Sequence, residues 1–149
     1  MITSLKNPQI RNIIQLNQKA KERRVQKLFT AEGRKMFLEA PADWVEKVYV
    51  SETMEKDEEL MARVQRFPME TVSDTVFRQM CDTQTPQGIL TVLRSPSYDM
   101  EDLLRKKNPL LMVLEDLQDP GNAGTILRTG EGAGVSGIFL TRTCVDITN

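Results

Sequence analysis

The sequence contains no histidine, and its two cysteines, Cys81 and Cys144, lie far apart in the chain. Without histidine, nucleophilic catalysis by a Ser-His or Cys-His pair is excluded, and the residues argue against a zinc site. No apolar run approaches the length of a membrane span, and the first residues lack the apolar core of a signal peptide. We therefore expect a cytoplasmic protein without a metal site and without a membrane partner.

The composition is typical of globular proteins, with 40% hydrophobic and 28% charged residues. A chain of 149 residues can form one domain, or one small domain and part of another. The net charge of −1 hides an uneven distribution, because residues 1–35 carry nine lysines and arginines against two glutamates. That segment has a net charge of +7 and the remainder −8. Such a basic arm favours a polyanion-binding surface, although a solvated helix face explains it equally well.

Residues 1–94 alternate between helical and extended patterns, which predicts a small α/β sandwich. Extended segments are expected at Leu28–Ala31, Trp44–Ser51, Met69–Val72 and Ile89–Leu93. Helices are expected from Gln9, through Met36–Leu38, over Glu52–Arg66 and after a cap at Ser73 or Asp74. Residues 95–108 become polar and charged, and they are predicted to be a linker with a short helix at Met100–Lys106.

Residues 110–141 form a glycine-rich strand–helix–strand pattern, with six of the eight glycines between Gly121 and Gly137. We expect a buried strand at Leu110–Leu114, a turn at Asp119–Asn122, a helix from about Ala123 and a strand at Gly137–Thr141. In such parallel βαβ units, ligands bind beyond the carboxyl ends of the strands. Because one βαβ unit buries too little surface to be a domain, we expect the chain to be the front part of a longer protein.

The candidate site within this stretch is Asn122-Ala-Gly124-Thr-Ile-Leu-Arg128, directly after Asp-Pro-Gly121. The glycine spacing matches neither a dinucleotide site nor a P-loop, so a nucleotide-binding α/β protein is the weakest interpretation. Asn122 could simply cap the helix, and Arg128 could be a surface residue or pair with Glu131 or Glu115. Alternatively, the guanidinium of Arg128 suits a bidentate phosphate contact. In an ideal helix the two side chains converge only if Asn122 lies in the non-helical turn.

At these residues the sequence resembles the SpoU/TrmH family of RNA ribose 2′-O-methyltransferases, within the SPOUT superfamily. LEDLQDPGNAGTILRTGEGAGVSGIFLT resembles the first conserved motif of that family over its whole length. SLKNPQIRNIIQL, FTAEGRKMFLEA and TPQGILTVL resemble the RNA substrate-binding domain that precedes the catalytic domain in many members. That domain has a fold like the small ribosomal proteins that bind kinked RNA.

The resemblance implies three segments: an RNA-binding domain at residues 1–94, the linker at 95–108, and at 109–149 the first βαβ portion of a trefoil-knot methyltransferase domain. It further implies that the full-length protein transfers a methyl group from S-adenosylmethionine to a ribose 2′-hydroxyl of rRNA or tRNA, and that it forms a homodimer. Asn122 and Arg128 would lie near the target nucleotide, and Gly121 and Gly124 would shape the turn. The two later motifs that hold the cofactor are absent, so we expect no cofactor-binding residues and no activity in this chain alone.

The RNA partner implied by the resemblance makes the basic arm the expected binding surface, with an affinity that falls as salt rises. The candidate RNA-binding residues are Lys6, Asn7, Arg11, Lys19, Arg23, Arg24 and Arg34. An alternative of a different class remains: a non-catalytic RNA-binding module, in which the βαβ unit serves only for docking or dimerisation.

Overall fold

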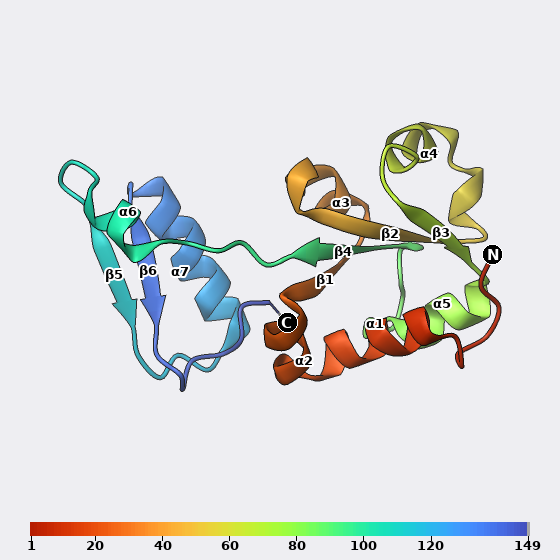
Figure 1. The fold of residues 1–149 in the computed structure, drawn as a ribbon, viewed down its shortest axis with the longest axis horizontal. Coiled ribbons are helices and arrows are strands. Elements are labelled where there is room, and N and C mark those ends of the chain that lie inside the picture. Colours follow the sequence, from red (N-terminus) through yellow and green to blue (C-terminus); the bar gives the residue numbers. More distant parts are fainter. Residues whose placement is uncertain (149) are drawn as a thin grey trace. The chain divides into compact units, whose positions relative to one another are not determined.

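The computed structural model describes residues 1–148 and divides into two compact units, unit 1 (Met1–Pro96 with Thr148) and unit 2 (Ser97–Ile147) (Figure 1). Asn149, the last residue of the predicted methyltransferase segment, lies outside the described residues. The predicted domain boundaries at residues 94 and 109 stay predictions, because contacts alone do not show which segment folds independently. Within the described part of the chain, no helix combines the length and the apolar character needed to cross a membrane.

Unit 1 contains a four-stranded sheet with the strand order β1-β4-β2-β3. The strands are β1 (Leu28–Glu32), β2 (Val45–Ser51), β3 (Met69–Val72) and β4 (Ile89–Arg94). β4 is antiparallel to β1 and β2, whereas β3 is parallel to β2. It follows that β1, β2 and β3 end at the edge where β4 begins. We call this the carboxyl edge; it consists of residues 33–34, 52–54, 73–74 and 86–88.

Helices cover both faces of this sheet. One face carries α1 (Pro8–Gln18) and α5 (Asp74–Met80), and α2 (Ala20–Gln26) lies beside α1 (Figure 1). The other face is covered by α3 (Arg34–Glu39) and α4 (Glu58–Val64). Two short 3-10 helices, η1 (Ala42–Trp44) and η2 (Met54–Lys56), lie in the connections. The α/β sandwich predicted for residues 1–94 is therefore confirmed.

Two hydrophobic cores fill the space between these layers because side chains alternate along each strand. In β2, Tyr49 faces the core under α1 and α5, and its neighbours Val48 and Val50 face the core under α3 and α4. The buried stripe of α1 packs into the first core, where it meets Phe77 of α5. The helical spacing of Ile10, Ile13 and Leu16 supplies that stripe.

The single helix predicted over Glu52–Arg66 is wrong. The segment breaks into η2 and α4 because Asp57 adopts an extended conformation between them, with φ −81° and ψ 91°. The Asp57 carboxylate then accepts a hydrogen bond from the Leu60 N–H at 3.0 Å and caps α4. Backbone N–H bonding at this cap also lowers the pKa of Asp57, as does the neighbouring guanidinium of Arg34.

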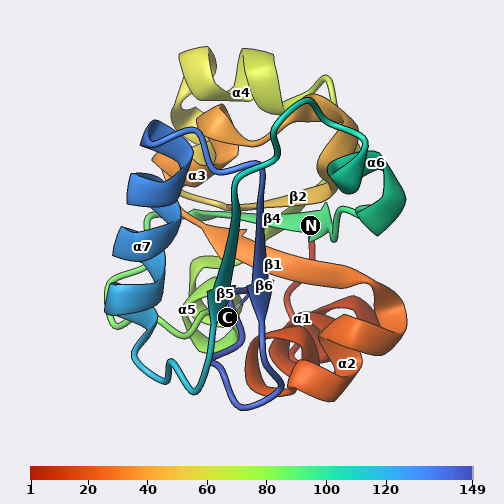
Figure 2. The same ribbon diagram turned by 90° about the vertical axis from the view of Figure 1, so that its left-hand side faces the viewer.

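Unit 2 confirms the predicted βαβ unit. Its elements are α6 (Met100–Leu104), β5 (Leu111–Leu114), α7 (Pro120–Gly132) and β6 (Gly137–Leu140), with β5 and β6 parallel. Figure 2 shows α7 and α6 on opposite sides of the two strands.

The prediction that β5 is buried is wrong, since Leu111 is 37% and Val113 68% exposed. These side chains point away from α7. On the other face of the strand, Met112 packs against α7 at Gly130, where a Cβ would lie 3.6 Å from Cε of Met112. The apolar character of β5 does not by itself specify whether another element covers the face of the strand that carries Leu111 and Val113.

Candidate functional site

α7 begins three residues earlier than predicted, at Pro120. Asp119 is its N-cap, and its carboxylate accepts a hydrogen bond from the Asn122 N–H at 2.6 Å. Asn122 therefore lies inside the first helical turn and does not cap the helix. Proline at the first helical position after an aspartate is a favourable helix start, which explains the earlier beginning.

The predicted turn role of Gly121 and Gly124 is wrong for the same reason, because both lie in α7 and neither has a positive φ. A Cβ on Gly121 would lie 3.2 Å from Oδ1 of Asp119, so a side chain here would crowd the cap. A Cβ on Gly124 would lie 3.6 Å from Nη1 of Arg128, an ordinary contact. The Arg128 side chain therefore runs past Gly124 at a distance that would also accommodate alanine.

The guanidinium of Arg128 folds back toward the N-terminus of α7, as long helical side chains do. Its Nη2 donates a long hydrogen bond of 3.4 Å to Oγ1 of Thr125, and that hydroxyl donates to the Gly121 carbonyl at 2.9 Å. Within the part of the chain that the structure describes, Arg128 forms no ion pair, so the alternative pairing with Glu131 or Glu115 is absent. The exposed fork retains donors for an anionic ligand.

Asn122 and Arg128 lie six residues apart in one continuous helix, about 120° from a common face. The backward course of the arginine brings its guanidinium to the level of Gly124 and Thr125, about one turn from Asn122. The structure thus gathers both predicted residues near the start of α7 without direct contact between them. Thr125, which orients the guanidinium, was missed because a hydroxyl within a helix carries little sequence signal.

The loops at the carboxyl ends of β5 and β6 lie beside each other near the cap of α7. Thr141 donates its backbone N–H to the Leu114 carbonyl at 3.0 Å, and its Oγ1 accepts from the Asp116 N–H at 3.3 Å. The side-chain amide of Gln118 donates to Oδ1 of Asp116 and to the Thr143 carbonyl. The polar groups of these loops are consequently satisfied by one another.

Three of the predicted RNA-binding residues form contacts within the chain, and their RNA-binding role stays a prediction. Arg23 is only 5% exposed, and its guanidinium donates to the carbonyls of Leu16 and Asn17 at 2.6 and 2.9 Å. It therefore satisfies the C-terminal carbonyls of α1, which the turn into α2 leaves without helical partners. Asn7 caps α1, since its Oδ1 accepts from the Gln9 N–H at 2.8 Å.

The third is Arg34, whose guanidinium pairs with Asp57 at 2.5 Å and approaches Glu59 at 3.8 Å. Its partners are more than twenty residues away, so no local pattern indicates the pairing. The other four candidates, Lys6, Arg11, Lys19 and Arg24, are exposed. Two further exposed lysines of the same region, Lys21 and Lys27, were not among the predicted residues.

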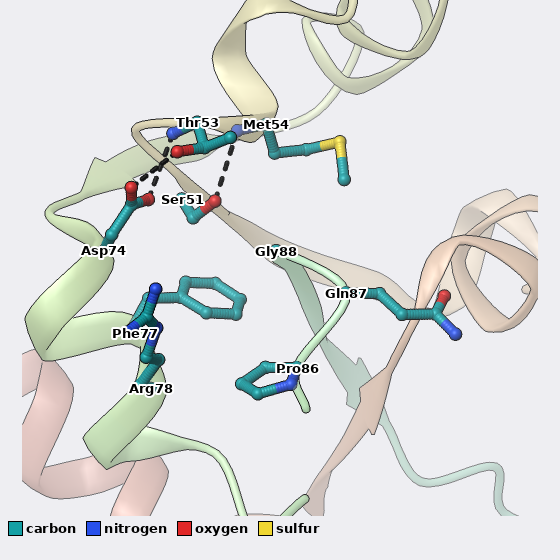
Figure 3. Close-up of a pocket in the computed structure, with 9 residues that line it drawn as sticks. All are labelled: Ser51, Thr53, Met54, Asp74, Phe77, Arg78, Pro86, Gln87 and Gly88. Atoms are coloured by element: carbon teal, nitrogen blue, oxygen red, sulfur yellow. Dashed lines mark hydrogen bonds between the residues drawn. The ribbon is translucent and has the colours of Figure 1, made fainter. Parts of the chain in front are cut away.

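A cavity of about 240 Å³ opens at the carboxyl edge of unit 1 (Figure 3). Its lining residues are Ser51, Thr53, Met54, Asp74, Phe77, Arg78, Pro86, Gln87 and Gly88. Both carboxylate oxygens of Asp74 accept hydrogen bonds from Thr53, one from its N–H and one from its hydroxyl. These bonds lower the pKa of Asp74 and tie the loop after β2 to the start of α5. We therefore interpret this carboxylate as part of the loop scaffold.

Comparison with known proteins identifies relatives of both units. Residues 7–91 match the MRM3-like substrate binding domain. An uncharacterised tRNA/rRNA methyltransferase of Synechocystis sp. is 36% identical over 99% of this chain and 55% of its own length. The 23S rRNA (guanosine(2553)-2′-O)-methyltransferase RlmP of Bacillus subtilis is 29% identical over 99% of this chain and 57% of its own length.

A crystal structure of an AdoMet-bound rRNA methyltransferase from Sinorhizobium meliloti superposes on 99% of this chain and 56% of that chain. The TM-score is 0.78 at 28% sequence identity. The chain thus has the α/β fold of the N-terminal half of such enzymes and spans about half the length of these relatives. With its substrate-binding domain matched over most of unit 1, the chain belongs to the MRM3-like substrate-binding family and is a relative of the SpoU/TrmH RNA methyltransferases.

Proposed function

We propose that the full-length protein is an RNA methyltransferase that transfers a methyl group from S-adenosylmethionine to a ribose 2′-hydroxyl of rRNA or tRNA. Unit 1 would bind the RNA, and the start of α7 would supply Asn122 and Arg128 to the target nucleotide. The observation that carries this proposal is the guanidinium of Arg128, which is exposed, folded back to the start of α7 and without an ion pair among the described residues. The names of the relatives support the reaction class.

In this proposal Arg128 clamps the phosphate next to the reacting ribose. Its planar fork can form two parallel hydrogen bonds to phosphate oxygens. A guanidinium stays protonated at neutral pH, so it is unsuited to accept the proton of the 2′-hydroxyl. We assign that proton to a phosphate oxygen or to water, and to Arg128 the positioning of the phosphate.

In this proposal the residues of this chain do not bind S-adenosylmethionine on their own. At the carboxyl ends of β5 and β6, the Asp116 N–H donates to Thr141, and the Gln118 amide donates to Asp116 and to the Thr143 carbonyl, so these groups already have partners within the chain. We infer that the cofactor binds to a later, trefoil-knot segment of the full-length protein. Calorimetric titration should therefore show S-adenosylmethionine binding by the full-length protein and none by residues 1–149.

Arg128→Lys in the full-length protein tests the clamp. Lysine keeps the charge but loses the fork, and one charge-assisted hydrogen bond is worth about 1.5–3 kcal/mol, so turnover should fall about 10- to 100-fold. Arg105→Lys is the matched control, because Arg105 lies in the same unit and pairs with Glu101 at 2.8 Å on the exposed surface of α6. Methylation by Arg128→Lys at a near wild-type rate would show that the clamp is wrong.

The alternative is a non-catalytic RNA-binding module. It predicts that the full-length protein binds RNA and does not bind the cofactor. A homodimer and a cytoplasmic location are also part of the proposal; light scattering of the full-length protein would test the first, and cell fractionation the second.

A further inference from the structure

The exposed side of α2 carries cations at helical spacing. Lys21, Arg24 and Val25 follow the i, i+3, i+4 pattern and are exposed, while the neighbouring Arg23 is buried. Lys19 precedes the helix and Lys27 follows it, and both are also exposed. We call Lys19, Lys21, Arg24 and Lys27 the α2 face. In the described part of the chain none of the four forms an ion pair, so their charges are directed to solvent.

The backbone beneath the α2 face is held firmly against α1. The amides of Asn12 and Gln26 bond reciprocally at 3.0 and 2.9 Å, and buried Arg23 bonds to the end of α1. Asn17 of α1 in turn donates to the Met80 carbonyl at the end of α5. The α2 face is thus preorganised, which reduces the ordering cost of binding a partner.

The opposite side of the sheet offers exposed Arg63 and Arg66, but most of its other charged residues are carboxylates. Arg34 pairs with Asp57, and Lys35 lies 3.8 Å from Glu39. Between residues 52 and 59, five carboxylates surround a single lysine, at the loop that also borders the cavity. An RNA phosphate approaching this side or the carboxyl edge would meet like charge.

The α2 face also lies where unit 1 passes into the linker. The Ser95 N–H, just after β4, donates to the Lys27 carbonyl at 2.8 Å. The chain therefore leaves unit 1 directly beside the α2 face. Val25, 70% exposed between Arg24 and Lys27, adds an apolar contact suited to a ribose or base next to the phosphates.

We propose that the α2 face is the phosphate-binding surface of unit 1, so that substrate RNA lies along the α1–α2 side of the sheet and away from α3, α4 and the carboxyl edge. This inference rests on the proposed function, and it selects one of several surfaces on which that function could depend.

Charge reversal at two matched pairs tests the inference in the full chain. Lys21→Glu with Arg24→Glu alters the α2 face, whereas Arg63→Glu with Arg66→Glu makes the same charge change at exposed residues on the α4 side. The probe is a fluorescently labelled RNA hairpin with a single-stranded loop, titrated by anisotropy over a range of potassium chloride concentrations. The α2 pair should weaken binding tenfold or more and lower the log–log salt slope by about two, one for each lost contact. The α4 pair should change affinity less than about threefold, because only the long-range field changes.

Equal losses from both pairs, or a larger loss from the α4 pair, would overturn the inference. If the α2 double variant fails to fold, Lys21→Gln with Arg24→Gln removes the charges without reversing them and should still lower the slope. Binding by the unaltered chain combined with full binding by the α2 variants would reject this surface but leave the proposed function intact. Absence of salt-dependent RNA binding by the unaltered chain would contradict the proposed function itself.

Discussion

Arg23 and Arg24 are adjacent arginines, yet the structure predicts opposite consequences when each is replaced by alanine. The guanidinium of Arg23 is buried and donates to the carbonyls of Leu16 and Asn17, at 2.6 and 2.9 Å. Arg24 is exposed, with a single hydrogen bond of 3.3 Å from Nε to the Ala20 carbonyl. Arg23→Ala should destabilise unit 1, and Arg24→Ala should weaken RNA binding.

The size of the Arg23 effect follows from its two short bonds. A hydrogen bond to a charged group contributes about 1.5–3 kcal/mol, and truncation also leaves two helix-end carbonyls without donors. Relief from burying the guanidinium offsets part of this loss. We therefore expect Arg23→Ala to lower the free energy of unfolding by about 2–4 kcal/mol. Arg24→Ala should stay within about 0.5 kcal/mol of the unaltered chain, as is usual for exposed sites.

Urea unfolding followed by tryptophan fluorescence separates the two outcomes. The only tryptophan, Trp44, packs against the core under α3 and α4 and reports on unit 1. RNA affinity of each folded variant is measured by anisotropy at one fixed salt concentration. If Arg23→Ala unfolds at the same urea concentration as the unaltered chain, or loses RNA affinity as Arg24→Ala does, the structural role of Arg23 is refuted.

Two further predictions concern Gly88 and Tyr49 of unit 1, with Gly132 of unit 2 as the control for Gly88. Gly88 has φ +78°, and a Cβ there would lie 2.7 Å from the buried Oγ of Ser51, so Gly88→Ala should cost about 2–3 kcal/mol in urea unfolding. Gly132→Ala meets nothing within 4 Å and should be neutral or slightly stabilising; equal effects would contradict the steric argument. Burial, with a smaller effect from the carboxylate of Glu70, raises the pKa of Tyr49 to about 12. In a Tyr98→Phe variant Tyr49 is the only tyrosine, so the tyrosinate absorbance of the folded chain should rise with a midpoint near that value. Because an unfolded tyrosine ionises at about 10, the unfolded state loses its proton first, and stability should fall by about 2 kcal/mol between pH 10 and 12. A tyrosinate midpoint near 10 would refute the burial argument.

Several elements could be predicted because their causes are local. Alternating apolar residues indicate β2 and β4, and the 3.6-residue spacing in α1 indicates its buried stripe. The sequence also indicates the start of α7 at Pro120, because aspartate is a favourable N-cap and proline a favourable first helical residue. The same residues are also typical of a turn, which is why the predicted helix begins later.

The residue pattern alone indicates the α/β class, the βαβ unit and the position of Arg128 within a helix that follows a strand. It could not determine which charged residues reach solvent. The burial of Arg23 follows from the turn between α1 and α2, and the pairing of Arg34 with Asp57 joins segments more than twenty residues apart. Which charges meet a partner within the chain, and which stay exposed to solvent like those of the α2 face, depends on the folded arrangement. The reason is that a charge pattern along the sequence does not specify the distances between side chains.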